Sequence, residues 1–318
     1  YLTTNSLLAS EQSAYRQHHS VETALIRVQN DLLQALDNGD EAVLVLLDLT
    51  SAFDMVNHQI LLSRLRDRFG VAGVAADWFA SYLSGREQRV IIDGVMSDPT
   101  PLHCGVPQGS VIGPILFVCY TTPVQDIIHA HGLSCMMYAD DTQLYITMNS
   151  ADRIQAISKL EACLHEVRSW MATNHLILND GKMEVIHISS PMKRLQELPA
   201  ISFGDLQVST TKSARDLGVV IDSQMSMRRH INVTCYKASL ALRKLGSIRH
   251  FLCKHTTEIL VHAFISSLLD NCNSLLVGLP DKEISKLQRI QNSAARLVSL
   301  SKKRDHITPV LKSLHWLP

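Results

Sequence analysis

Three aspartates stand where their carboxylates could act on one substrate. Asp48 directly follows a short apolar run, and Asp140 and Asp141 form a doublet between two segments that alternate like strands. Carboxylates that lie close together repel one another unless a divalent cation is bound among them. Oxygen ligands of this kind prefer Mg²⁺ or Mn²⁺, and two such ions can activate an attacking hydroxyl and stabilise a leaving pyrophosphate. The alternative is that each aspartate is only a turn residue, which is common at strand ends and in hairpins.

The segments next to these aspartates have the patterns of strands. Ala42–Leu47 is a continuous apolar run rich in strand formers, and it predicts a buried strand that ends at Asp48. Leu133–Tyr138 and Thr142–Met148 flank the aspartate doublet and predict a hairpin. If the buried strand and the hairpin are adjacent and antiparallel, the three carboxylates come within reach of one another.

The rest of the chain divides into a mixed part and a helical part. Helices are expected over His58–Phe69, Val74–Leu83, Val111–Tyr120 and Ala151–Thr173, and further strands over Arg89–Val95, Glu184–Ile188 and Leu217–Ile221. Beyond His230 the pattern is helical only, and one helix is expected after Pro280 with Asp281 as its N-cap. We place a boundary near Asp222–Met227, with an α+β domain over residues 1–222 and a helical region over residues 223–318.

Formal charge is distributed unevenly over these two parts. The whole chain has 30 Lys and Arg against 30 Asp and Glu, a balance that by itself argues against nucleic-acid binding. Residues 1–226, however, hold 15 basic and 25 acidic residues, whereas residues 227–318 hold 15 and 5, so the net charges are −10 and +10. An acidic part attracts metal ions and a basic part attracts phosphate backbone, although basic helical faces are often only solvated surface.

Hydropathy and cysteine usage favour an intracellular protein that is not embedded in a membrane. No apolar run reaches the roughly 18 residues that a spanning helix needs. The seven cysteines are odd in number, widely spaced and without a zinc-binding pattern, which predicts free thiols in a reducing compartment, the cytoplasm or the nucleus. The first residues, Tyr1–Thr4, are typical of an internal start rather than of a signal peptide, so we expect the chain to be a fragment.

Three segments resemble, in order and spacing, motifs A, B and C of reverse transcriptases. They are Leu46–Asp54, Gly105–Ser110 and Tyr138–Asp141. The closest resemblance is to the polymerases of non-LTR, or LINE-type, retrotransposons. Weaker similarities are those of Gln12–Arg16 to the second fingers motif, of Asn179–Lys182 to motif D, and of Leu217–Asp222 to the strand that leads to the primer grip. The resemblance implies a right-hand polymerase with partial fingers, an α+β palm built on an antiparallel sheet, and a helical, thumb-like region.

By this resemblance, the motif residues bind metal ions and the incoming nucleotide. Asp48 and Asp140 would bind two Mg²⁺ ions, or Mn²⁺ as a substitute, with Asp141 beside them and the carbonyl of Leu49 as a further ligand. Phe53 would lie under the incoming sugar and exclude a 2′-hydroxyl, whereas without the motif it would be taken for a core residue. The other residues that would contact the nucleotide are Arg16, Gly105, Pro107, Gln108 and Gly109.

The remaining implied roles concern the leaving group and the primer. Lys182 would give a proton to the leaving pyrophosphate. The residues that would grip primer and template are Leu217, Gly218, Arg228 and Arg229. Simpler alternatives stay open, because Lys182 could be an exposed turn lysine, Arg16 a solvated surface residue, and the glycine-containing loop a plain tight turn.

The sequence thus predicts an RNA-directed DNA polymerase that extends a DNA primer with dNTPs on an RNA template. A second hypothesis is an inactive remnant, or a domesticated nucleic-acid-binding protein, that keeps the palm fold without turnover. An RNA-templated RNA polymerase is a third, and Phe53 and the Ala-Asp-Asp sequence of motif C argue against it. The sequence indicates no oligomeric state.

Overall fold

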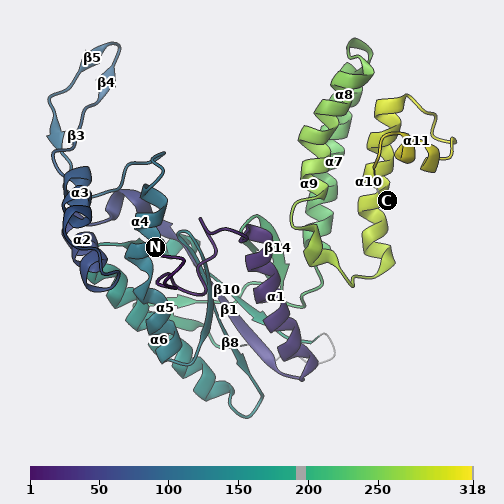
Figure 1. The fold of residues 1–318 in the computed structure, drawn as a ribbon. Coiled ribbons are helices and arrows are strands. Elements are labelled where there is room, and N and C mark those ends of the chain that lie inside the picture. Colours follow the sequence, from purple (N-terminus) through teal and green to yellow (C-terminus); the bar gives the residue numbers. More distant parts are fainter. Residues whose placement is uncertain (191–197, 317–318) are drawn as a thin grey trace. The chain divides into compact units, whose positions relative to one another are not determined.

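The computed structural model describes residues 1–190 and 198–316 of the chain. The chain forms two compact units, Tyr1–Lys212 and Ser213–Pro318 (Figure 1). This division falls ten residues before the boundary expected at Asp222, because a hairpin at residues 213–222 belongs with the helices that follow it. The assignment of these parts as palm and thumb stays a prediction.

A four-stranded antiparallel sheet forms the centre of the first unit, in the order β10–β1–β8–β7 (Figure 1). Its strands are β1 (Glu41–Leu47), β7 (Ser134–Tyr138), β8 (Asp141–Met148) and β10 (Glu184–Ile188). The expected buried strand is therefore β1, which lies between the expected hairpin β7–β8 on one side and β10 on the other. A strand with a partner strand on each side and helices on both faces is shielded from solvent. This shielding explains its continuous apolar sequence.

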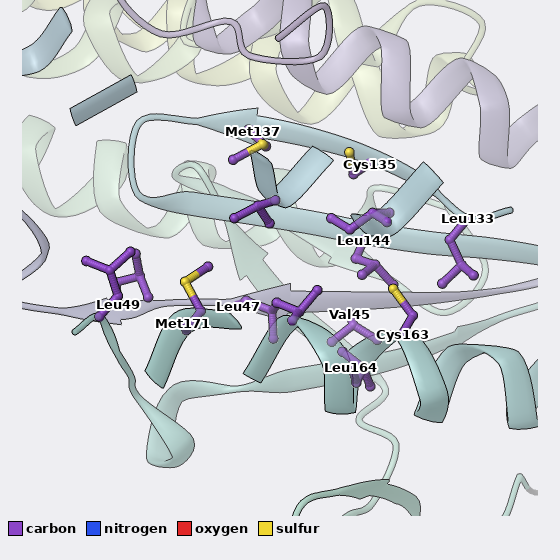
Figure 2. Close-up of a cluster of buried hydrophobic side chains, with 14 of the residues drawn as sticks. Val45, Leu47, Leu49, Leu133, Cys135, Met137, Leu144, Cys163, Leu164 and Met171 are labelled. Atoms are coloured by element: carbon purple, nitrogen blue, oxygen red, sulfur yellow. The ribbon is translucent and has the colours of Figure 1, made fainter. Parts of the chain in front are cut away.

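Alternating side chains of β1 face two different layers. Val45 and Leu47, followed by Leu49, lie against Cys163, Leu164 and Met171 of α6 (Arg153–Thr173) in the core that Figure 2 shows. Of the intervening residues of β1, which point to the opposite face, Ala42 and Leu44 are fully buried and Leu46 is half-buried. There α1 (Val21–Asp37) contacts β1 and β7. The sheet is thereby covered on both faces, so that its functional groups can emerge only at its ends.

Four further helices and a hairpin also belong to the first unit. The helices are α2 (His58–Asp67), α3 (Val74–Leu83), α4 (Gly113–Thr121) and α5 (Pro123–Ala130). The prediction of one strand over Arg89–Val95 was wrong: the segment holds the two-residue strands β4 (Ile91–Ile92) and β5 (Val95–Met96), with their side chains exposed. Asp93 and Gly94 both have positive φ, 51° and 81°, which is the backbone of a tight hairpin turn.

Short elements connect the sheet to its surroundings. β2 (Leu49–Thr50) pairs with β9 (Ile177–Leu178), and the short helices η1 (Ala52–Met55) and η2 (Asp180–Lys182) follow β2 and β9 respectively. Three more strand pairs are present, made by β3 (Glu87–Gln88) with β6 (Thr100–Pro101), β11 (Ile201–Phe203) with β12 (Leu206–Val208), and β13 (Ser213–Asp216) with β14 (Val219–Asp222).

The second unit is helical after its opening hairpin β13–β14. Its helices are α7 (Arg228–Ile248), η3 (Arg249–Phe251), α8 (Lys254–Val261), the π-helical segment η4 (His262–Ser266), α9 (Ser267–Leu269), η5 (Asn273–Leu276), α10 (Asp281–Ser299) and α11 (Thr308–Ser313). Buried side chains of α7, α8 and α10, among them Ala238, Val261 and Ala294, form their shared core. The prediction that the chain is helical beyond His230 is confirmed.

Two details of the second unit differ from expectation. The strand expected over Leu217–Ile221 begins only at Val219, because Leu217 and Gly218 form the turn of the hairpin with φ of 44° and 91°. The N-cap of α10 is Pro280 rather than Asp281, which is the first helical residue. A carboxylate in the first turn still interacts favourably with the positive end of the helix dipole. Asp281 therefore stabilises the start of α10, although it lies one position after the predicted N-cap.

In the part of the chain that the structure describes, no helix is both long and apolar enough to cross a membrane. Four of the seven cysteines are buried, at Cys119, Cys135, Cys163 and Cys272.

Candidate active site

The central strands bring the three predicted carboxylates to one end of the sheet. Leu47, the last residue of β1, pairs with Thr142 of β8, and Tyr138 pairs with Asp141 where the hairpin closes. Asp48 therefore leaves β1 beside the Ala139–Asp140 turn. The expected approach of these residues, separated by about 90 positions in the sequence, is a direct result of this register.

The three carboxylates interact electrostatically. Burial is the largest cause, and together with the negative charges of Asp140 and Asp48 and against the opposing charge of Lys182 it raises the pKa of Asp141 to about 6. A carboxyl group in this environment holds its proton more strongly because the ionised form is poorly solvated and has like charges around it. Relief comes from any positive charge that approaches the group.

Lys182 supplies such a charge at Asp48. Its ammonium Nζ lies 3.1 Å from Oδ2 of Asp48, and its side chain is 68% exposed. Two backbone contacts hold η2 in place: the N–H of Asn179 donates to the carbonyl of Asp48 at 2.9 Å, and β9 pairs with β2. Arg168 clamps η2 from the other side through a two-pronged ion pair with Asp180, at 2.9 and 3.0 Å. The predicted lysine is thus placed among the predicted carboxylates.

The donor set suits a hard divalent cation. Oδ2 of Asp48 is shielded from solvent and accepts no hydrogen bond from the described residues, so that its partner there is the positive charge of Lys182 at 3.1 Å. A buried carboxylate oxygen without a hydrogen bond is costly, and a cation relieves that cost. In the described ranges, however, no three His, Cys, Asp or Glu side chains are close enough together to hold a metal ion as they stand. Leu49, whose carbonyl was expected as a ligand, is buried in β2. The ligand set therefore stays a prediction.

Motif A and the motif B loop are joined into one structure. Phe53 is half-buried and stacks on Phe117 of α4, with ring centroids 4.7 Å apart, and its carbonyl accepts from the N–H of Val106 at 2.9 Å. Gly105 has a φ of +87°, and a Cβ there would lie 3.1 Å from the carbonyl oxygen of Asp54. Only glycine permits this backbone and this approach, so Gly105 lets the loop pack directly on the backbone of Asp54.

The far side of the motif B loop is exposed where it could meet a ligand. Gln108 is exposed, and its Nε2 donates to both carboxylate oxygens of Asp54, at 3.1 and 3.3 Å. Gly109 has open space around its Cα and a φ of +79°. Ser110 fixes the loop below them, because its hydroxyl donates to the carbonyl of Pro107 at 2.7 Å and accepts from the N–H of Gly113 at 3.0 Å. The sequence predicted a helix that starts at Val111. The bond from the N–H of Gly113 to the hydroxyl of Ser110 explains why α4 begins at Gly113 instead.

Arg16 holds its own loop. Its Nη1 donates to the carbonyl oxygens of Ala9, Ser10 and Gln12, at 3.0 to 3.3 Å. The guanidinium is thereby kept half-buried at the edge of β7, and a phosphate contact would use its remaining nitrogens. Its role toward the triphosphate stays a prediction.

The predicted grip residues all lie in the second unit. Leu217 and Gly218 form the β13–β14 turn, and Arg228 and Arg229 open α7. Arg229 Nη1 donates to the hydroxyl of Ser213, and Arg228 Nε lies 3.8 Å from Glu283 while most of its side chain is exposed. Their role in gripping primer and template stays a prediction.

Two residues at this site had no role in the sequence analysis. Tyr15 is exposed beside Asp140, and burial of its hydroxyl followed by the charge of that carboxylate raises the pKa of Tyr15. Gln12 is buried and hydrogen-bonded to the peptide groups of Ala139. Both belong to the segment that resembles the second fingers motif, but no local pattern could reveal contacts across more than 120 positions.

Comparison with known proteins decides the family. Residues 1–221, more than two thirds of the chain, match the family model described as reverse transcriptase (RNA-dependent DNA polymerase). The chain belongs to the reverse transcriptase family. The segments that resemble motifs A, B and C all fall within the matched residues.

The curated relatives of this chain come from mobile elements. The chain is 28% identical over 244 residues to the RNA-directed DNA polymerase from mobile element jockey of Drosophila funebris, covering 72% of this chain and 26% of that protein. It is 25% identical over 308 residues to the probable RNA-directed DNA polymerase from transposon X-element of Drosophila melanogaster, covering 94% and 33%. The prediction of a LINE-type member is confirmed. The chain spans between about a quarter and a third of the length of these relatives.

A solved structure of Candida tropicalis telomerase in complex with a fragment of telomeric RNA is also similar. It shares 13% sequence identity with this chain at a TM-score of 0.45, covering 100% of this chain and 56% of the telomerase chain. The family assignment rests on the family model and not on this similarity.

Proposed function

We propose that this chain is the polymerase core of a LINE-type RNA-directed DNA polymerase, which adds dNTPs to the 3′-hydroxyl of a DNA primer on an RNA template. The observation that carries the proposal is the convergence of Asp48, Asp140 and Asp141 at one end of the β1–β8 pair, with Lys182 beside them. Burial and mutual repulsion raise the pKa of Asp141. Clusters of carboxylates with raised pKa values are common in active sites and rare among aspartates that have only a structural role.

Asp48 and Asp140 would hold two Mg²⁺ ions, for which Mn²⁺ is a possible substitute, with Asp141 and the carbonyl of Leu49 as supporting groups. When bound, such ions lower the pKa of the primer hydroxyl and neutralise charge on the transferred phosphate. The strands contribute by placing the carboxylates before substrate arrives, so that no reorganisation is needed during the reaction.

Phe53 would discriminate between deoxyribose and ribose. Its stacking on Phe117 and the hydrogen bond from Val106 to its carbonyl prevent the ring from moving away. A ring held in this way can exclude a 2′-hydroxyl by contact, without itself making a polar interaction. Gly105, Pro107, Gln108 and Gly109 would present backbone and an amide side chain to the same nucleotide.

Lys182 and Arg16 would act on the triphosphate. Lys182 is tethered at Asp48 by η2 but is largely exposed, so its ammonium can turn from the carboxylate to a phosphate oxygen and donate a proton to the leaving pyrophosphate. Arg16 would offer the nitrogens that do not hold its loop.

The second unit would hold the duplex. Residues 227–318 contain 15 Lys and Arg against 5 Asp and Glu, and Arg228 and Arg229 stand at the start of its longest helix. Such a surplus binds phosphate backbone with strong dependence on salt. The odd number of cysteines and their wide spacing along the sequence favour a reducing, intracellular location.

Primer extension on an RNA template with Mg²⁺ tests this function, using the chain as given and its Asp140→Asn variant. We expect extension by the chain and a loss of at least about a hundredfold in the variant. Asp205→Asn is the matched control, because Asp205 is exposed in the β11–β12 turn, and it should keep full activity. If the unaltered chain binds RNA in a salt-sensitive manner but extends no primer, the non-catalytic hypothesis replaces this one.

A further inference from the structure

The turn that carries Asp140 is held by a side chain from the start of the sequence. Gln12 is 1% exposed, and its Oε1 accepts from the N–H of Ala139 at 3.1 Å and from the N–H of Ala14 at 2.9 Å. Its Nε2 faces the carbonyl oxygen of Ala139 at 3.4 Å. One amide thus satisfies both polar groups of the residue directly before Asp140.

The backbone around Gln12 is fixed to the hairpin as well. The N–H of Ser13 donates to the carbonyl of Met137, and the N–H of Met137 donates to the carbonyl of Glu11, both at 2.9 Å. These bonds add the segment 11–13 to the edge of β7 as a short parallel pair. Gln12 therefore cannot follow the turn if the turn moves, and the turn is held at a set position relative to the sheet.

The turn has a physical need for such a partner. Ala139 has a φ of 57°, in the left-handed region, where a residue with a Cβ is disfavoured. A two-residue turn with an unfavourable residue can relax toward other conformations unless something holds its peptide groups. Any such relaxation would move the neighbouring Asp140 carboxylate, and a displacement of about 1 Å in a catalytic group can lower a rate about a hundredfold.

We propose that Gln12 is a positioning residue, which acts through the Ala139 peptide groups to fix the Asp140 carboxylate at the place where catalysis requires it. This inference rests on the proposed polymerase function. The amide side chain offers both the donor and the acceptor that the two sides of Ala139 require, whereas an ionised glutamate has no donor and methionine has no N–H or O–H donor.

Two variants test this role in primer extension. Gln12→Met keeps the length and burial of the side chain and removes its hydrogen bonds. We expect kcat to fall about a hundredfold while the KM for dNTP stays within about threefold, because Gln12 does not reach the nucleotide itself. Gln125→Met is the matched control: Gln125 is also buried, and it accepts from the N–H of Glu11 and donates to Ser10, without touching the turn. It should keep kcat within about threefold.

The proposal is overturned if both variants lose activity in equal proportion, or if Gln12→Met changes KM at constant kcat. A second measurement does not depend on the folding of a variant. In the unaltered chain, the Ala139 amide should exchange its hydrogen as slowly as the amides within β7 and β8. Rapid exchange at Ala139, measured by NMR, would contradict the clamp. Failure of the unaltered chain to extend primers would instead disprove the polymerase function and leave the exchange result to decide the clamp.

Discussion

Replacing Asp141 by asparagine should stabilise the metal-free protein at neutral pH. Asp141 is half-buried next to two other carboxylates, and its pKa of about 6 lies above the ordinary value of 3.8. Above pH 6 the group is ionised in both states, and the folded state carries the unfavourable charge. Because the folded state binds the proton more strongly, this destabilisation is fully present above the folded pKa and is lost below the unfolded one.

The size of the gain follows from the two pKa values. Their difference corresponds to about 3 kcal/mol, at about 1.4 kcal/mol for each tenfold change in the equilibrium constant. The side chain is only half-buried, so solvent screens part of the interaction, and we expect about 1 kcal/mol in practice. For a unit of this size, that gain raises the melting temperature by roughly 2–4 °C.

Urea and thermal unfolding in EDTA, from pH 4 to pH 8, measure this effect. Asp141→Asn should exceed the unaltered chain in stability at pH 7.5, and the difference should fade as the pH falls through 6 and be gone by about pH 4. Asp205→Asn, in an exposed turn, should show no such gain. Equal stability of Asp141→Asn and the unaltered chain at pH 7.5, or a gain that grows toward acid pH, would refute the reasoning that mutual repulsion and burial strain this site.

Three further predictions concern the neighbouring groups. Lys182→Met should bind Mn²⁺ up to about fivefold more tightly, because the exposed ion pair that competes for Asp48 is worth no more than about 1 kcal/mol. Electron paramagnetic resonance measures this affinity, and Lys182→Arg is the control. Equal Mn²⁺ affinity of the two variants would show that the ion pair does not compete. Gly105→Ala should lower the free energy of unfolding by about 1–3 kcal/mol in urea, since its φ of +87° and the carbonyl of Asp54 leave no room for a Cβ. Phe53→Ala should narrow the preference for dNTP over NTP about tenfold or more in primer extension, and an unchanged preference in an active variant would exclude a steric role for this ring.

The sequence was most informative where local pattern and tertiary role coincide. The apolar run of β1 and the alternation of the β7–β8 hairpin are consequences of burial, and both elements were predicted nearly residue by residue. The hairpin at Asp93–Gly94 was missed because a run of Val and Ile suggested one continuous strand, although the Asp-Gly pair is a turn signal. The strand expected over Leu217–Ile221 is present but begins only at Val219, because Leu217 and Gly218 form a turn.

By itself, the sequence determined the family and the identity of the chemical groups. Motif order and residue type are local properties, and they sufficed to single out Asp48, Asp140, Asp141 and Lys182. The tertiary structure decided which groups touch. The ion pair of Lys182 with Asp48 depends on the β2–β9 pairing, and the clamp of Gln12 on Ala139 joins residues 127 positions apart. Such contacts follow from strand register and burial, which are set only when segments distant in the sequence pair with one another. A short stretch of sequence does not contain that information.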